Sequence, residues 1–205
     1  MTPPSSSVFV VDDDLAVREA LSSLIRSVQL RVETFASADE FLARLARPAE
    51  GAECGVLDVR MPGMNGLDLQ RELARARPSL PVIFITGHGD IPMTVRAMKA
   101  GAVEFLPKPF SEQELLDAIR VALDRSLVLQ REHGAAAEVR ARFETLSTRE
   151  REVLALLRQG LRNKQSADQL GISEVTVKVH RHNIMEKMGA ASLQALLAMV
   201  ARLDA

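Results

Sequence analysis

The 205-residue sequence predicts a doubly wound α/β unit with a five-stranded parallel sheet, followed by a small all-α unit. In the first 123 residues, short and almost continuous apolar runs alternate with helical patterns, as is typical of parallel strands buried on both faces. Polar residues of a few chemical types follow these runs directly. From residue 144 onward only helical patterns remain, and two of them are joined by a short turn that contains glycine.

The strands are located by where the apolar runs stop. The runs and the residues that follow them are Val8–Val11 before Asp12 and Asp13, Gly55–Leu57 before Asp58, Val82–Ile85 before Thr86, and Val103–Leu106 before Pro107 and Lys108. The alternation as a whole predicts five βα units joined by right-handed crossovers.

The helices of the first part are expected over residues 15–28, 38–46, 66–76, 92–100 and 111–131. Two of them begin with capping boxes, Ser37-x-x-Glu40 and Ser111-x-x-Glu114. Residues 124–143 are rich in Arg, Glu and Ala and are interrupted by Gly134, so we expect a helical but breakable linker that continues the fifth helix. The predicted organisation is therefore a domain over 1–123, a linker over 124–143 and a domain over 144–205.

The second domain begins with a further capping box, Ser147-x-x-Glu150, in a helix that Gly160 ends. Further helices are expected over 163–170, 174–188 and 192–203. The tight turn at 171–173 predicts a helix-turn-helix, in which the second helix enters the DNA major groove. The alternative interpretation is a small helical bundle for protein contacts, with ordinary surface Lys and Arg.

Composition is compatible with two soluble globular domains: 47% of residues are hydrophobic and 26% are charged. No apolar stretch approaches the ~18 residues of a membrane span, and the first seven residues lack the features of a signal peptide, so a cytosolic protein without membrane association is expected. The single cysteine, Cys54, excludes an internal disulfide and is expected to be a core thiol. Residues 140–205 carry eleven Lys or Arg and seven Asp or Glu, a net +4, which leaves −5 for residues 1–139; a polyanionic partner is therefore expected for the second domain.

The polar residues after the strands predict a cation-and-phosphate site, because the carboxyl ends of parallel strands share one edge of the sheet. Crowded carboxylates repel each other unless a cation such as Mg²⁺ neutralises them. One carboxylate can then attack phosphorus, while an ammonium and a hydroxyl stabilise the product. The alternative is that Asp12 or Asp13 merely caps the following helix.

Several motifs resemble the receiver domain of bacterial response regulators over residues 1–123. They are Val11-Asp-Asp-Asp14, Asp58-Val-Arg-Met-Pro-Gly-Met-Asn-Gly66, Ile85-Thr-Gly-His-Gly-Asp90 and Lys108-Pro-Phe110. The Gly-His-Gly-Asp run, with Met98-Lys-Ala-Gly-Ala102, resembles the FixJ-like branch. The resemblance implies a flavodoxin-like (CheY-like) fold.

The resemblance also implies roles for individual residues. Asp58 would be the phosphoacceptor, and Thr86 and Lys108 would contact the phosphoryl group. Asp13 and Asp58 would ligate Mg²⁺ directly together with the backbone carbonyl of Arg60, and Asp12 would act largely through water. Phe105 would be the aromatic that rotates with the switch, although many receivers have Tyr there, so a hydroxyl-mediated part of the switch is absent. In FixJ-like relatives the face formed by the fourth helix and fifth strand makes the dimer, which here would involve Val95, Lys99 and Glu104.

The second domain resembles the LuxR-type DNA-binding domain over 144–205, through Leu146–Leu154, Gly160–Lys164 and Gly171–His180. By position, the residues that would face bases are Lys178, Val179 and His182, and those nearer the phosphates are Thr176, Arg181, Lys164 and Asn183. Ser166 stands where the family usually has an isoleucine, so looser packing of that helix is expected.

Together these features predict a DNA-binding transcriptional response regulator and not an enzyme, apart from slow self-dephosphorylation. A sensor histidine kinase would phosphorylate Asp58, and the modified protein would form a homodimer on double-stranded promoter DNA, with RNA polymerase as a further partner. One alternative is an atypical regulator that works without phosphorylation. The other is an aspartate-nucleophile phosphatase, which is disfavoured because the run Asp12–Asp14 contains the Asp-x-Asp pair only trivially and no substrate-capping domain is present.

Overall fold

The computed structural model describes residues 6–49, 51–87 and 91–203. The chain divides between Arg131 and Glu132 into two compact units. The predicted Gly87–Asp90 motif lies for the most part outside the described residues, because these do not include 88–90.

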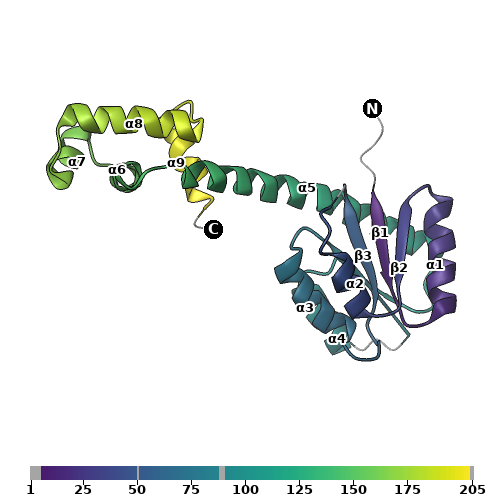
Figure 1. The fold of residues 1–205 in the computed structure, drawn as a ribbon. Helices are drawn as coiled ribbons and strands as arrows, with labels where there is room; N and C mark the ends of the chain where they lie inside the picture. Colours follow the sequence, from purple (N-terminus) through teal and green to yellow (C-terminus); the bar gives the residue numbers. More distant parts are fainter. Residues whose placement is uncertain (1–5, 50, 88–90, 204–205) are drawn as a thin grey trace. The chain divides into compact units, whose positions relative to one another are not determined.

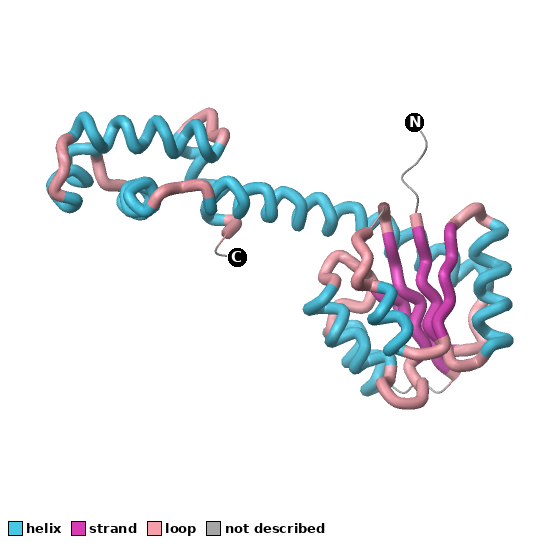
Figure 2. Tube along the Cα trace, in the orientation of Figure 1, coloured by secondary structure: helices cyan, strands magenta, loops and turns pink. Residues whose placement is uncertain are grey.

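The first unit is built on a five-stranded, wholly parallel sheet with the order β2-β1-β3-β4-β5. Figure 1 shows β1 between β2 and β3, and Figure 2 shows helices around the strands. The strands are β1 (Ser7–Val11), β2 (Arg31–Phe35), β3 (Glu53–Asp58), β4 (Val82–Thr86) and β5 (Glu104–Pro107). The predicted doubly wound α/β fold is confirmed. Because the order reverses at β1, the carboxyl ends of β1 and β3 flank the crevice in which such sheets bind their ligands.

Helices cover both faces of the sheet, and strand alternation divides the core between them. Phe9 and Val11 of β1 belong to the apolar cluster under α2 (Ala38–Arg44), α3 (Gly66–Ala76) and α4 (Ile91–Lys99). Val8 and Val10 belong to the cluster under α1 (Leu15–Ser27) and the start of α5 (Glu112–Glu144). All four side chains are fully buried, so a register slip of one residue would exchange the contents of the two clusters.

Of the predicted capping boxes, the one at Ser37 forms only in part. Ser37 Oγ accepts from the amide of Glu40, 3.3 Å away, at the start of α2, but Glu40 Oε2 accepts from the amide of Ala36 (2.9 Å) and not from that of Ser37. Ser111 and Glu114 bond reciprocally, with the Glu114 amide donating to Ser111 Oγ (3.2 Å) and the Ser111 amide donating to Glu114 Oε2 (2.8 Å). The cap of α1 is Asp14, which accepts from the amides of Ala16 and Val17. The interpretation of Asp12 or Asp13 as the cap is therefore wrong.

Helix α5 runs over 33 residues and continues through Gly134. Leu115 and Ile119 near its start are buried in the core of the sheet unit, whereas Val139 and Phe143 near its end belong to the core of the second unit. The interruption expected at Gly134 does not end the helix.

The second unit contains α6 (Thr148–Arg158), α7 (Asn163–Leu170), α8 (Glu174–Met188) and α9 (Leu193–Ala201). Its core includes Val153, Val177, Ile184 and Leu196, all fully buried. Among the described residues no single helix is long and apolar enough to cross a membrane. Helices α8 and α9 reach the required length and apolar composition only when taken together, and the chain bends by 61° between them.

Cys54, the second residue of β3, is a fully buried free thiol, and burial raises its pKa far above the ordinary range. The core position expected for this thiol is confirmed.

The acidic pocket and the helix-turn-helix surface

The carboxyl ends of β1 and β3 and the loop after β5 bring together Asp12, Asp58 and Lys108. The Lys108 ammonium lies between the two carboxylates, with Nζ 2.8 Å from Asp12 Oδ2 and 3.0 Å from Asp58 Oδ1. The carboxylates are almost completely buried, whereas about a quarter of the Lys108 side chain is exposed. Three residues that the apolar runs placed at strand ends therefore form one ion cluster.

Backbone amides complete the hydrogen bonding of both carboxylates. The amide of Asp14 donates to Asp12 Oδ1 (2.9 Å), and the amide of Arg60 donates to Asp58 Oδ2 (2.6 Å). Each carboxylate thus has one oxygen on the Lys108 ammonium and the other on a main-chain donor. Such charge-assisted bonds fix the orientation of both groups.

The carboxylates of Asp12 and Asp58 keep the Lys108 ammonium charged. Burial is the largest influence on Asp58 and raises the pKa of its carboxyl, although Lys108 and the Arg60 amide act in the opposite direction. Burial alone would lower the pKa of Lys108, but its hydrogen bonds to Asp12 and Asp58 together outweigh this effect and raise it. A carboxylate that is more basic than usual is a better nucleophile while it remains ionised.

Thr86 and Phe105 lie on the neighbouring strands. Thr86, the last residue of β4, is buried, and its carbonyl accepts from the amide of Lys108 at 2.7 Å. Phe105 is 8% exposed and packs on Phe84 with ring centroids 6.2 Å apart. In this structure the Phe105 ring is therefore directed into the core.

A single glycine permits the close approach of α3 to Asp58. A Cβ at Gly66 would lie 2.4 Å from the carbonyl oxygen of Asp58 and 3.1 Å from Cα of Val59, contacts that a side chain cannot make. The amide of Gly66 donates to the carbonyl of Val59 at 3.0 Å. Gly66 ends the quoted motif that begins at Asp58, but its role in packing could not be read from the residue types alone.

A cleft of about 860 Å³ opens beside the ion cluster. Its lining includes Asp13, Arg60, Met61, Met93 and Arg96. Asp13 is exposed and does not take part in the hydrogen bonds by which Lys108 connects Asp12 with Asp58. Within the described ranges no three His, Cys, Asp or Glu side chains are gathered as a metal site, so the predicted set of Asp12, Asp13 and Asp58 is not preassembled.

The predicted dimer residues are at the surface. Val95 is 43% exposed on α4, and Lys99 and Glu104 are also exposed. Ile91 and Met98 of α4 expose further apolar area.

The predicted DNA-binding residues surround the turn between α7 and α8. Gly171 ends α7 in the left-handed conformation (φ 64°), and Ser173 caps α8 by accepting from the amide of Thr176 (3.0 Å). Val175, Lys178, Val179 and His182 are exposed at helical spacing i, i+3, i+4 and i+7, and therefore share one face of α8.

The valines of α8 are divided between its two faces, which explains why they form no single stripe in the sequence. Val177 is fully buried, while Val175 and Val179 are 69% and 52% exposed. Arg181 is half-buried, and its Nη1 donates to Asn163 Oδ1 at 2.5 Å, so it ties α8 to α7. Lys164 is exposed, and Thr176 and Asn183 are half-buried.

Comparison with known proteins assigns both units. Residues 8–120 match the response regulator receiver domain, and residues 144–200 match the family described as bacterial regulatory proteins, luxR family. The chain belongs to the two-component transcriptional response regulators that join a receiver to a LuxR-type helix-turn-helix, the FixJ/NarL family. This membership implies a kinase and DNA as partners. The family consists of transcription regulators and not enzymes, which excludes the phosphatase alternative.

Individual relatives match along the whole chain. The response regulator protein TmoT of Ectopseudomonas mendocina is 52% identical over 203 residues, 99% of this chain and 91% of TmoT. FixJ of Rhizobium meliloti (strain 1021) is 43% identical, over 94% of each chain. The solved structure of the response regulator StyR has a TM-score of 0.78 and 52% identity, covering 97% of this chain and 99% of StyR.

Proposed function

We propose that Asp58 accepts a phosphoryl group from a partner sensor histidine kinase, and that the modified receiver promotes dimerisation and binding to promoter DNA. The observation that carries this proposal is the ion cluster, in which a buried carboxylate is oriented by Lys108 and by the Arg60 amide. A carboxylate oxygen of Asp58 would attack phosphorus as the P–N bond of the kinase's phosphohistidine breaks, and the released imidazole nitrogen would take up a proton.

The donor set fits Mg²⁺, which receiver domains typically use for phosphorylation. Asp13, Asp58 and the backbone carbonyl of Arg60 would hold the ion, with Asp12 acting largely through water; all are hard oxygen donors. The ion, when bound, would neutralise charge on the phosphoryl oxygens. Lys108 would exchange its contact with Asp58 for one with the phosphoryl group, and Thr86 would donate a hydrogen bond to it.

The output side of the proposal rests on the exposed surfaces of both units. The aspartyl-phosphate would carry roughly −1.5 to −2 charge in place of the single negative charge of the Asp58 carboxylate. A shift of the active-to-inactive ratio from 1:99 to 99:1 requires ~5.5 kcal/mol of differential stabilisation. Part of this differential stabilisation would come from a dimer formed through Val95, Lys99 and Glu104. Rotation of Phe105 would accompany the change. Pairing two DNA-binding domains then raises the affinity for two half-sites.

On DNA, Lys178, Val179 and His182 would face bases, while Lys164, Thr176, Arg181 and Asn183 would be nearer the phosphates. We further propose domain limits of 1–123 and 144–205 with a linker over 124–143, a cytoplasmic location, and RNA polymerase as a downstream partner.

The decisive experiment is phosphorylation of the full chain by acetyl phosphate with Mg²⁺, measured as intact mass and as alkali-labile label. Asp58→Asn should abolish incorporation, because an amide is not a nucleophile. Thr34→Ala, at an exposed position of β2, is the control and should be labelled like the wild type. Undiminished labelling of Asp58→Asn would exclude Asp58 as the acceptor. Absence of labelling in the wild type would favour the phosphorylation-independent regulator.

A further inference from the structure

Ser126, in the middle of α5, is fully buried and uses the whole hydrogen-bonding capacity of its hydroxyl. Its Oγ accepts from the amide of Glu53 (3.1 Å) and from Gln130 Nε2 (3.3 Å), and donates to the carbonyl of Ser79 (3.1 Å). One donor and two acceptor positions are all that a hydroxyl offers. These partners lie at the amino-terminal edge of the sheet, opposite the acidic pocket.

The hydroxyl takes the place of a rung in the β3–β4 ladder. The amide of Gly55 donates to the carbonyl of Pro81 at 2.9 Å. In a parallel ladder the next bond that β3 donates would come two residues earlier, from the Glu53 amide to the Ser79 carbonyl, and the intervening bond to the Glu53 carbonyl cannot form because Pro81 has no N–H. Ser126 Oγ bonds to both groups instead, so a helix side chain extends the ladder after the two main chains have separated.

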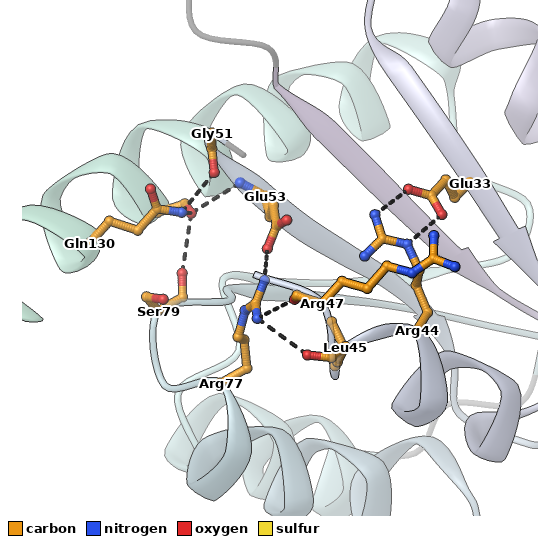
Figure 3. Close-up of polar contacts among 10 residues, drawn as sticks. Glu33, Arg44, Leu45, Arg47, Gly51, Glu53, Arg77, Ser79 and Gln130 are labelled. Carbon is orange, nitrogen blue, oxygen red and sulfur yellow. Dashed lines mark hydrogen bonds and ion pairs between the residues drawn. The ribbon is translucent and has the colours of Figure 1, made fainter. Parts of the chain in front are cut away.

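Gln130, one turn further along α5, makes a second attachment. Its Nε2 donates to the carbonyl of Gly51 at 2.8 Å (Figure 3). The same Nε2 also donates to Ser126 Oγ. Residues four apart share one helix face, so Ser126 and Gln130 lie next to each other on α5. Ser126 binds Glu53, the first residue of β3, and Gln130 binds Gly51, two residues before it. We call these two residues the α5 latch.

An ion pair connects the latch with α3. Arg77 Nη2 lies 2.9 Å from Glu53 Oε2, and both side chains are largely buried (Figure 3). Arg77 Nη1 also donates to the carbonyls of Leu45 and Arg47 (3.3 and 2.9 Å). Arg77 directly follows α3, the helix that begins at Gly66 against the carbonyl of Asp58. One rigid helix thus runs from the phosphoacceptor loop to the residue that pairs with Glu53.

We propose that the α5 latch keeps residues 124–131 of α5 docked on the receiver sheet, and that the phosphorylation signal reaches the DNA-binding domain through it by way of α3 and Arg77. The docking of residues 124–131 rests only on the hydrogen bonds of Ser126 and Gln130. The second part rests on the proposed function, because it needs phosphorylation at Asp58. Helix α5 is the covalent route for the signal, since its last turns belong to the core of the second unit.

Hydrogen exchange of the full-length, unphosphorylated protein tests the docking. Ser126→Ala and Gln130→Leu should each accelerate exchange of the α5 amides over 124–131 by roughly 5- to 150-fold, the range for buried groups that lose a partner. Alanine is a better helix former than serine, and leucine equals glutamine, so lost helix propensity cannot explain faster exchange. The matched controls are Ser23→Ala and Gln113→Leu, both at exposed helical positions, and they should leave this segment unchanged. Unchanged exchange in both latch variants would overturn the docking.

The signalling part is tested with acetyl phosphate and a DNA duplex selected from a random pool by the phosphorylated wild-type protein. The wild type should bind this duplex more tightly after phosphorylation, and Gln130→Leu should reduce that gain at least about fivefold while Asp58 is labelled normally. An unchanged gain together with faster exchange would overturn the signalling route and leave the docking in place. Absence of labelling at Asp58 in the wild type would instead refute the proposed function, and the exchange data would still decide the docking.

Discussion

Removing the hydroxyl of Ser166 should stabilise the helix-turn-helix unit. Ser166 lies on α7, is fully buried, and its Oγ has no hydrogen-bond partner among the residues that the structure describes. An unsatisfied buried polar group costs about 1–3 kcal/mol, and replacing serine by alanine within a helix adds up to about 0.5 kcal/mol. We therefore expect Ser166→Ala to increase the free energy of unfolding by about 1–3 kcal/mol, since the void left by one oxygen is small.

For a unit of this size, 1 kcal/mol corresponds to a rise in melting temperature of about 4–8 °C. The chain has no Trp or Tyr, so the assay is calorimetry of the full chain, with the transition assigned by hydrogen exchange of α7. Ser23→Ala, at an exposed position of α1, changes helix propensity without removing a buried hydroxyl and is the control. A melting temperature that is unchanged or lower in Ser166→Ala would show that the hydroxyl is bonded and would refute the reasoning.

Three further predictions concern charged groups. The hydrogen bond from Lys187 (2.7 Å), with a smaller contribution from the Ser147 cap, lowers the pKa of Glu150 against the opposing effect of burial. The stability that results is present above the unfolded pKa of ~4.3 and is lost as pH falls through the folded pKa. On acid titration, the free energy of unfolding of Glu150→Gln should therefore fall less than that of the wild type. An equal fall in both proteins would contradict this. Lys178→Ala should cost ~1–3 kcal/mol on the specific DNA and little on random DNA, whereas Arg181→Ala should weaken both and flatten the salt dependence; identical losses in filter binding would exclude base contact by Lys178. Asp13→Ala should weaken Mg²⁺ binding, measured by calorimetry, with a neutral or raised melting temperature in the absence of metal, and a large fall in stability would indicate a structural role.

The fold could be predicted wherever burial leaves a clear pattern. Strands β1, β3 and β4 are enclosed on both faces and appear in the sequence as apolar runs. Strand β2 is an edge strand in which Arg31 and Thr34 are exposed, and its sequence does not show a run of this kind. Gly134 was expected to interrupt the linker, but a glycine inside a helix costs only about 1 kcal/mol relative to alanine, and three alanines follow it. Such a cost is too small to end α5.

The acidic pocket was predictable in outline, because the position of a residue at a strand end also determines its position in space. Asp12, Asp58 and Lys108 therefore meet as expected. Their detailed arrangement depends on local geometry: Asp14 caps α1, while the neighbouring Asp13 faces the cleft. The α5 latch could not be predicted, because the partners of Ser126 lie 73 and 47 residues away and an isolated serine in a helix carries no pattern.

The charge balance of the ion cluster supports the proposal that phosphoryl transfer to Asp58 uses a divalent cation. Two carboxylates and one ammonium leave one net negative charge in a largely buried site. The aspartyl-phosphate would carry roughly 1.5 to 2 negative charges in place of the single charge of the Asp58 carboxylate, and Lys108 can neutralise only one. Arg60 and Arg96 line the adjacent cleft, but a guanidinium cannot be coordinated by the carboxylates as a metal ion can. Asp13 lines this cleft and does not share the Lys108 contacts, so an added cation can bind through it without displacing Lys108 from Asp12.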